Sequence, residues 1–180
     1  LGHRRLSIID VSAVSNQPMW DHSGRYVLIF NGELYNYKEL RQQYPSYPFK
    51  TQSDTEVIFA GYEKHGPDCL KGMNGMFAFA LWDTADKQLF VARDRLGKKP
   101  FYYYRSDKQF IFSSEVRSVI KSGLFHAELD ERNLTEYFYY QAPIGTNTLV
   151  KGISCLKAGH YGIIENGKFS EVPYWSYADA

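Results

Sequence analysis

The 180-residue chain carries 21 basic and 20 acidic residues and a net charge of +1 at pH 7, which gives no reason to expect a nucleic acid or membrane partner. Hydrophobic residues make up 44% and aromatic residues 17%, so the chain is expected to fold as one domain, with or without a tail. No apolar run reaches the length of a membrane span, and no signal peptide is visible. Cys69 and Cys155 lie far apart with no CxxC pattern, which favours the reducing cytoplasm over a disulfide framework.

Strands are predicted first from runs of β-branched and aromatic residues between turn signals. Segments such as MFAFALW are apolar on both faces, so the sheets need layers above and below them. In that segment large Phe77 and Phe79 alternate with small Ala78 and Ala80, and we expect the small face to receive a closely packed element. The predicted strands are 5–9, 25–30, 76–83, 88–93, 101–104, 109–113, 161–165 and 168–172.

Helices are predicted at 33–44, 54–64, 114–122 and 131–140. Ser53 or Asp54 can cap the second of these, and Asp130 can cap the fourth. Strands and helices come in separate blocks and do not alternate strictly, which predicts a layered α+β domain.

The stretch YVLIFNGELYN raises a question about local structure. Its strand runs into Asn31-Gly32, the strongest two-residue hairpin signal, yet the residues that follow have helical spacing at Leu34, Tyr37 and Leu40. We therefore expect the strand to end at Asn-Gly, so that backbone and side-chain donors, followed at once by Glu33, project into a cleft.

Taken singly, the polar features have ordinary explanations. Arg4 and Arg5 can be solvated charges beside a strand, Asn31-Gly32 a turn, and Asp54 a helix cap. Taken jointly they describe a pocket for a zwitterion. A guanidinium matches an α-carboxylate, acidic side chains match an ammonium group, and an Asn amide beside a Gly N–H can stabilise an oxyanion.

Two further features are assigned structural roles. Arg93 and Asp94 in RDRLGKKPFYY are expected to form an ion pair at a strand end. Lys98 and Lys99 are not expected to bind phosphate, because no helix-opening Gly-rich loop surrounds them. The five histidines have no metal-ligand spacing, so no metal is expected.

The segments GHRRLSIID, NGELYNYKELR, SDTEV, GMFAFALWD and RDRLGKKPFYY, in this order, resemble the glutaminase domain of the asparagine synthetases. These are class II glutamine amidotransferases of the N-terminal-nucleophile hydrolase type. The resemblance implies a four-layer αββα sandwich, here N-terminally truncated. It also implies site residues: Arg5 for the glutamine α-carboxylate, beside the backbone of Ile8 and Ile9; Asn31 and Gly32 for the oxyanion; and Glu33 and Asp54 for the ammonium group. It gives Arg4 no role.

One departure from the family pattern is serious. The family's nucleophile is an N-terminal cysteine whose α-amine acts as the base, whereas this sequence starts at Leu1. Cys69 and Cys155 are interpreted as small core or surface residues. The chain is therefore expected to be an inactive fragment of a longer parent protein, lacking its first strands. Residues 1–173 would form the glutaminase domain, and residues 174–180 would begin the linker towards an absent synthetase domain that uses ATP and Mg.

Three interpretations of the function stay open. The parent can be an enzyme that hydrolyses glutamine and uses the ammonia to amidate aspartate or a related carboxylate. It can instead be a nucleophile-free structural relative of the β-lactam-synthetase type, or a non-catalytic module that binds amino acids. Joint presence of the zwitterion-binding residues favours the enzyme. Glutamine and the synthetase domain are then the expected partners, and a homodimer is among the oligomeric states that the sequence leaves open.

Overall fold

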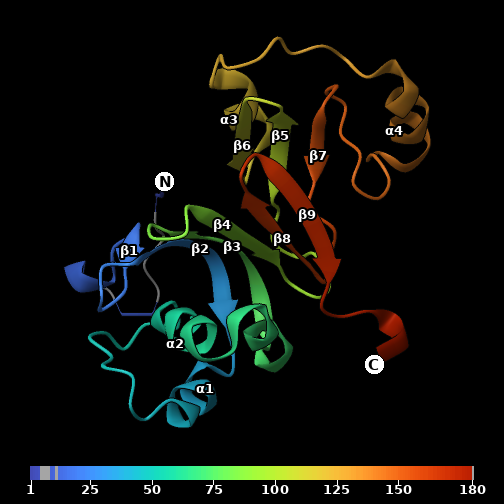
Figure 1. Ribbon diagram of the computed structural model, residues 1–180. Helices are drawn as coiled ribbons and strands as arrows, with labels where there is room; N and C mark the ends of the chain where they lie inside the picture. The colour runs from blue at the N-terminus through green and yellow to red at the C-terminus, as the bar shows by residue number, and fades with distance from the viewer. Residues whose placement is uncertain (5–8, 11, 180) are drawn as a thin grey trace.

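The computed structural model describes residues 1–4, 9–10 and 12–179 (Figure 1). Its larger sheet has six strands in the order β1-β2-β3-β4-β8-β9, and each neighbouring pair is antiparallel. The smaller sheet has three antiparallel strands in the order β6-β5-β7. The larger sheet consists of β1 (Met19–Trp20), β2 (Tyr26–Leu34), β3 (Gly75–Asp83), β4 (Gln88–Arg93), β8 (His160–Glu165) and β9 (Lys168–Pro173). The smaller consists of β5 (Tyr102–Ser106), β6 (Gln109–Ser113) and β7 (Ile153–Cys155).

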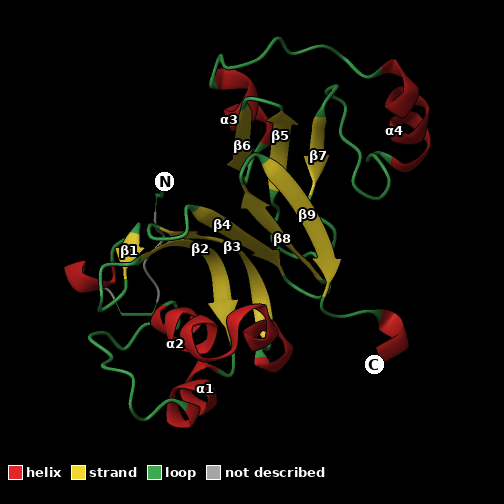
Figure 2. Cartoon of the chain, viewed as in Figure 1, coloured by secondary structure: helices red, strands yellow, loops and turns green. Residues whose placement is uncertain are grey.

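The helices lie outside the two sheets (Figure 2). The α-helices are α1 (Tyr37–Gln43), α2 (Glu56–His65), α3 (Val116–Lys121) and α4 (Leu134–Tyr140). Short 3₁₀ helices are η1 (Ala13–Ser15), η2 (Gly66–Gly72), η3 (Glu131–Asn133) and η4 (Tyr177–Asp179). No helix within the described part of the chain is long and apolar enough to cross a membrane.

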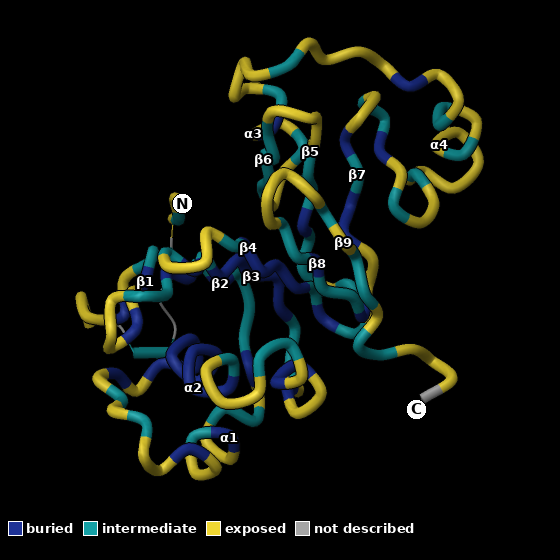
Figure 3. The backbone as a smooth tube through the Cα atoms, viewed as in Figure 1, coloured by how far each residue is buried: buried dark blue, intermediate teal, exposed yellow. Residues whose placement is uncertain are grey.

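Two hydrophobic cores separate the layers. One core fills the space between α1, α2 and η2 and one face of the larger sheet, with Leu28, Phe59 and Phe79 among its fully buried members. The other lies between the two sheets and includes Val91, Phe101 and Leu156. Because α3 packs on β5 and β6 on the far side, the layers run helix, sheet, sheet, helix. The four-layer αββα prediction is confirmed, and Figure 3 shows the buried residues following β3, β4 and α2.

The alternation in β3 works as the sequence predicts. Phe77 and Phe79 enter the core under the helices, whereas Ala78 and Ala80 belong to the core between the sheets. Small side chains on that face allow the second sheet to approach, which is the physical reason for the alternation.

The boundaries of several elements differ from the prediction. Strands 88–93 and 109–113 have the predicted bounds, but α1 begins only at Tyr37, not at 33. The strand expected to end at Asn31-Gly32 continues to Leu34, because β2 keeps pairing with β3 as far as Leu34 opposite Gly75. The prediction of a strand end at Asn-Gly is therefore wrong. Residues 5–8 of the strand predicted at 5–9 lie outside the described residues, and β1 and β7 were not predicted because two or three residues show no periodicity.

Arg93 and Asp94 do not form the expected ion pair. The Arg93 guanidinium donates to three backbone carbonyls, those of Lys99 (2.7 Å), Leu156 (2.7 Å) and Gly97 (2.6 Å). The Asp94 carboxylate instead accepts from backbone N–H groups, including that of Lys99 at 2.9 Å. The two side chains thus tie down the loop after β4, and this loop carries Lys99 to the site described next.

Candidate functional site

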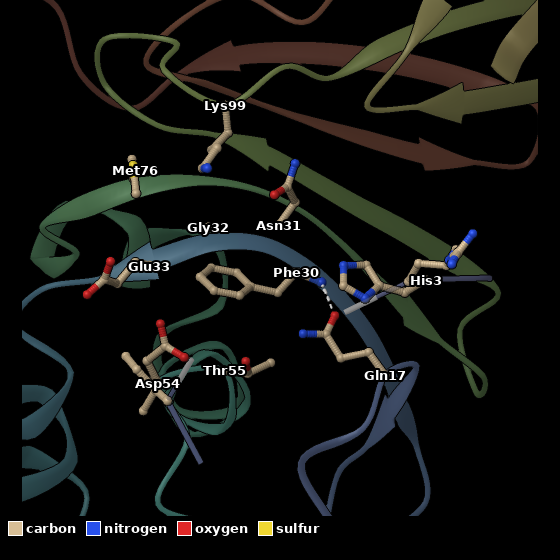
Figure 4. A pocket seen from close by; sticks show the side chains of 12 residues that line it. His3, Gln17, Phe30, Asn31, Gly32, Glu33, Asp54, Thr55, Met76 and Lys99 are labelled. Atoms are coloured by element: carbon tan, nitrogen blue, oxygen red, sulfur yellow. Dashed lines mark hydrogen bonds between the residues drawn. The ribbon is translucent and has the colours of Figure 1, made fainter. Parts of the chain in front are cut away.

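A pocket of about 190 Å³ opens beside the second half of β2 (Figure 4). Its size suits a ligand such as an amino acid better than a nucleotide, since drug-sized ligands occupy about 300–1,000 Å³. The wall is mostly polar and combines residues from the N-terminal segment, β2, the start of α2 and the loop before β5. The lining residues are His3, Arg4, Ile9, Gln17, Phe30, Asn31, Gly32, Glu33, Asp54, Thr55, Met76 and Lys99.

The free edge of β2 presents one unpaired backbone donor to this pocket. Phe30 N–H donates to the side chain of Gln17 at 2.6 Å, and Leu34 N–H donates to Asp54 Oδ2 at 3.0 Å. N–H groups two residues apart in a strand point to the same edge, so Gly32 N–H points there too. Its partner across the ladder, Phe77, directs its own N–H and C=O to Asp94 on the other side. Gly32 N–H therefore faces the pocket, and no described residue accepts from it.

A close approach of two strands explains why residue 32 is glycine. Gly32 has φ +156°, and a Cβ there would lie 2.1 Å from the Met76 carbonyl oxygen and 2.7 Å from Phe77 Cα. Only a residue without a side chain can occupy the position, because the atoms in the way are backbone. Asn-Gly thus marks a close contact within a continuous sheet, not a turn.

Asn31 precedes Gly32 in β2, so its side-chain amide lies next to the Gly32 N–H. It pairs with Ala78 across the ladder, so its side chain leaves the sheet on the face opposite to Phe30. In Figure 4 the amide points up towards Lys99, at the rim of the pocket. Asn31 makes no side-chain hydrogen bond with any described residue. A side-chain amide and a backbone N–H are thus adjacent and available, as the oxyanion prediction requires.

Two carboxylates occupy the other end of the pocket. Asp54 is 5% exposed, and burial raises its pKa, with the charge of nearby Glu33 acting in the same direction. Asp54 does not cap α2; its carboxylate accepts the Leu34 N–H, and the N-cap position belongs to Thr55. Two acidic groups that repel each other in one pocket favour a cationic ligand, because a cation stabilises both ionised forms.

The remaining predicted residues are placed only in part. Arg5 and Ile8 lie outside the described residues, while Ile9 lines the pocket. Arg4, to which the resemblance gives no role, lines it as well.

The sequence did not indicate six of the pocket residues, which are His3, Gln17, Phe30, Thr55, Met76 and Lys99. Lys99 was considered only as a phosphate ligand. Proximity in the sequence to a predicted site residue was the available signal, and it applied to Thr55 next to Asp54 and to Phe30 next to Asn31. Gln17 and Lys99 reach the site from segments distant in the sequence.

The two thiols lie away from the pocket. Cys69 is buried in η2 beneath α2, and burial raises the pKa of its thiol to about 12. Cys155 is buried in β7 of the smaller sheet. Neither lines the pocket. Within the described residues, no group of three or more His, Cys, Asp or Glu side chains is arranged to hold a metal ion.

This fold occurs among known glutamine amidotransferases. The chain is similar to glutamine phosphoribosylpyrophosphate amidotransferase from B. subtilis, with a TM-score of 0.64 and 19% identity, over 88% of this chain and 32% of that one. At this identity the likeness concerns the fold alone.

The chain belongs to the glutamine amidotransferase family, because the family model described as "Glutamine amidotransferase domain" matches residues 1–175. It is 36% identical to asparagine synthetase 3 (glutamine-hydrolyzing) of Bacillus subtilis (strain 168), over 97% of this chain and 29% of that protein. It is 39% identical to a putative glutamine-hydrolyzing asparagine synthetase of Mycobacterium bovis, over 95% of this chain and 28% of that protein. The resemblance to the asparagine synthetases is thereby confirmed, and the chain spans less than a third of the length of these relatives.

Proposed function

We propose that this chain is the glutaminase part of an asparagine-synthetase-like enzyme, which hydrolyses glutamine to glutamate and ammonia. The observation that carries the proposal is a backbone N–H at the pocket edge of β2, that of Gly32, from which no described residue accepts a hydrogen bond. The N–H groups of Phe30 and Leu34 are both taken by side chains, and Gly32 N–H between them is open to a pocket whose other end holds Asp54 and Glu33. A glutamine side-chain carbonyl fits that donor while its ammonium group meets the carboxylates.

Each part of the site then has a role in the reaction. Asp54 and Glu33 bind the ammonium group, and Arg5, beside the backbone of Ile8 and Ile9, binds the α-carboxylate. The amide carbon is attacked by a thiolate, and the negative charge moves to the carbonyl oxygen. Gly32 N–H and Asn31 Nδ2 stabilise that oxyanion, a contribution of roughly 10²–10³ in kcat per donor.

Collapse of the tetrahedral intermediate releases ammonia and leaves a thioester, and water then hydrolyses the thioester to glutamate. We assign the nucleophile to an N-terminal cysteine of the parent protein, with its own α-amine as the base. Cys69 is a poor candidate because its pKa of about 12 keeps the thiol protonated at neutral pH.

The ammonia would be consumed by a synthetase domain of the same parent chain. That domain would bind ATP and Mg and amidate aspartate or a related carboxylate, with residues 174–180 beginning the linker to it. The names of the relatives and the share of their length that this chain leaves uncovered, about 70%, support this arrangement. A cytoplasmic location and a homodimer are parts of the same proposal.

The position of the thiols favours a second candidate, a domain that binds an amino acid without cleaving it. Both candidates predict that the 180-residue chain binds L-glutamine, which isothermal titration calorimetry can measure. They differ in the parent protein, where the enzyme should release glutamate and the binding domain should not. Glutamate release by the 180-residue chain itself, abolished by Cys69→Ser or Cys155→Ser, would contradict the assignment of the nucleophile.

A further inference from the structure

The side chain of Gln17 extends the pairing of β1 with β2 beyond the end of β1. Met19 pairs with Leu28 and Trp20 with Val27, so the position opposite Phe30 belongs to Gln17. The backbone ladder has ended at that point, and the side-chain oxygen of Gln17 accepts the Phe30 N–H at 2.6 Å instead. A side chain thus completes the edge of β2 immediately before Asn31.

This hydrogen bond fixes the orientation of the Gln17 amide. A backbone N–H can only donate, so the group that meets it must be Oε1 and the other end of the amide must be Nε2. Figure 4 shows this nitrogen turned away from β2, into the pocket on the side of Thr55. Nε2 makes no hydrogen bond with a described residue, so two N–H donors face the pocket.

We propose that Gln17 is a substrate-binding residue whose Nε2 donates to the α-carboxylate of bound glutamine; this inference rests on the proposed function. Glutamine has two kinds of acceptor, the amide oxygen and the carboxylate. The two lone pairs of the amide oxygen are assigned to Gly32 N–H and Asn31 Nδ2. The ammonium group only donates, so it cannot pair with an amide NH₂. The carboxylate, with about four acceptor sites, is the remaining partner.

The contact would link substrate position to catalytic geometry. One planar amide would hold Phe30 N–H with its oxygen and the substrate carboxylate with its nitrogen. Phe30 lies two residues before Gly32, about 6.6 Å along the strand. The position of the carboxylate relative to the oxyanion donor would then be set by a rigid group. A guanidinium on the flanking segment 4–5 would supply charge to the same carboxylate.

A matched pair of variants tests the acceptor and the donor of the Gln17 side-chain amide separately. Gln17→Glu keeps an oxygen that can accept the Phe30 N–H but replaces the donor by a second oxygen. Gln17→Met removes both functions. By calorimetry on the 180-residue chain, Gln17→Glu should weaken L-glutamine binding about 10- to 150-fold, the range for a lost hydrogen bond to a charged group. Its midpoint in urea unfolding should stay near that of the wild type, whereas Gln17→Met should lower it.

A second ligand tests which atom of the substrate is contacted. L-glutaminamide has a neutral amide in place of the carboxylate, so it does not repel the Gln17→Glu side chain. The loss of affinity caused by Gln17→Glu should therefore be clearly smaller for L-glutaminamide than for L-glutamine. In the wild-type chain, the side-chain NH₂ signals of Gln17 in NMR spectra should move on addition of L-glutamine and move less with L-glutaminamide.

The outcomes distinguish failure of the Gln17 contact from failure of the proposed function. Wild-type chain that binds no L-glutamine refutes the proposed function and this inference with it. Normal L-glutamine binding by Gln17→Glu, or an equal loss for both ligands, refutes the inference and leaves the function standing. If Gln17→Glu does not fold, the NMR measurement on the wild type decides: unmoved Gln17 signals at saturating L-glutamine overturn the contact.

Discussion

The substitution Gly32→Ala tests the close approach of β2 and β3 and the oxyanion donor together. The added Cβ would lie 2.1 Å from the Met76 carbonyl oxygen and 2.7 Å from Phe77 Cα. Reaching an ordinary contact requires the two strands to move apart by roughly 1 Å, the kind of backbone shift that accompanies overpacking. Because neighbouring strands are held about 4.8 Å apart by their ladder, such a shift weakens the hydrogen bonds on both sides of the position.

The expected loss of stability is large for a single methyl group. Overpacking costs about 1–3 kcal/mol, and each weakened backbone hydrogen bond adds about 0.5–1.5 kcal/mol. We expect Gly32→Ala to lower the free energy of unfolding by about 2–5 kcal/mol, measured by urea unfolding followed by tryptophan fluorescence. Where the variant still folds, the displaced N–H should lower kcat with glutamine in the parent protein by about 10²-fold or more.

Two other glycines serve as controls. Gly167 has φ +74° and open space where a Cβ would be added, with nothing within 4 Å, so Gly167→Ala should show only the conformational cost of about 1–2 kcal/mol. Gly75 is the counterpart in β3, where a Cβ would lie 2.2 Å from the Glu33 carbonyl oxygen. Gly75→Ala should therefore destabilise the chain about as much as Gly32→Ala. If Gly32→Ala is no less stable than Gly167→Ala and retains wild-type kcat, both the close approach and the donor assignment are wrong.

Three further substitutions test the rest of the site. Asp54→Asn should abolish detectable L-glutamine binding in calorimetry yet raise the free energy of unfolding at pH 7. Because the pKa of Asp54 is raised in the folded protein, the native state binds this proton more tightly than the unfolded state does. The contribution of the carboxyl group to stability therefore falls as pH rises from the usual aspartate range through the raised pKa. The difference from wild type should vanish in acid, where Asp54 is protonated; a constant difference at all pH values would contradict the explanation. Asn31→Asp in the parent protein should nearly abolish kcat with glutamine, by placing a negative charge beside the oxyanion, and near-wild-type kcat would rule out the oxyanion role. Arg5→Ala in the parent should weaken glutamine use about 10- to 150-fold and spare the activity with free ammonia, whereas loss of both activities would show a structural role.

Local sequence determined much of the fold. The alternation of Phe77 and Phe79 with Ala78 and Ala80 predicted both faces of β3 correctly, because each face of a strand reports directly on the layer that covers it. Asp130 was predicted to cap the helix at 131–140; it accepts the Arg132 N–H and caps η3 at the start of that range, whereas α4 begins only at Leu134. These features depend on residues within a few positions of one another.

The grouping of four candidate site residues was also readable from residue types. Asn31, Gly32, Glu33 and Asp54 were grouped from the sequence, and the structure brings all four to one pocket. Their grouping followed from what a zwitterionic ligand needs, which does not depend on the path of the chain.

The tertiary structure alone decided what Asn31-Gly32 does. The dipeptide has the local signature of a turn, but β3, more than forty residues further on, pairs with it and leaves no room for a Cβ. Long-range contacts likewise brought Gln17 to the edge of β2 and turned Asp94 from an ion-pair partner into an acceptor of the Phe77 N–H. A local sequence pattern reflects the conformational preference of the backbone. A buried strand must also satisfy its backbone hydrogen bonds, and their partners depend on which distant segment lies beside it.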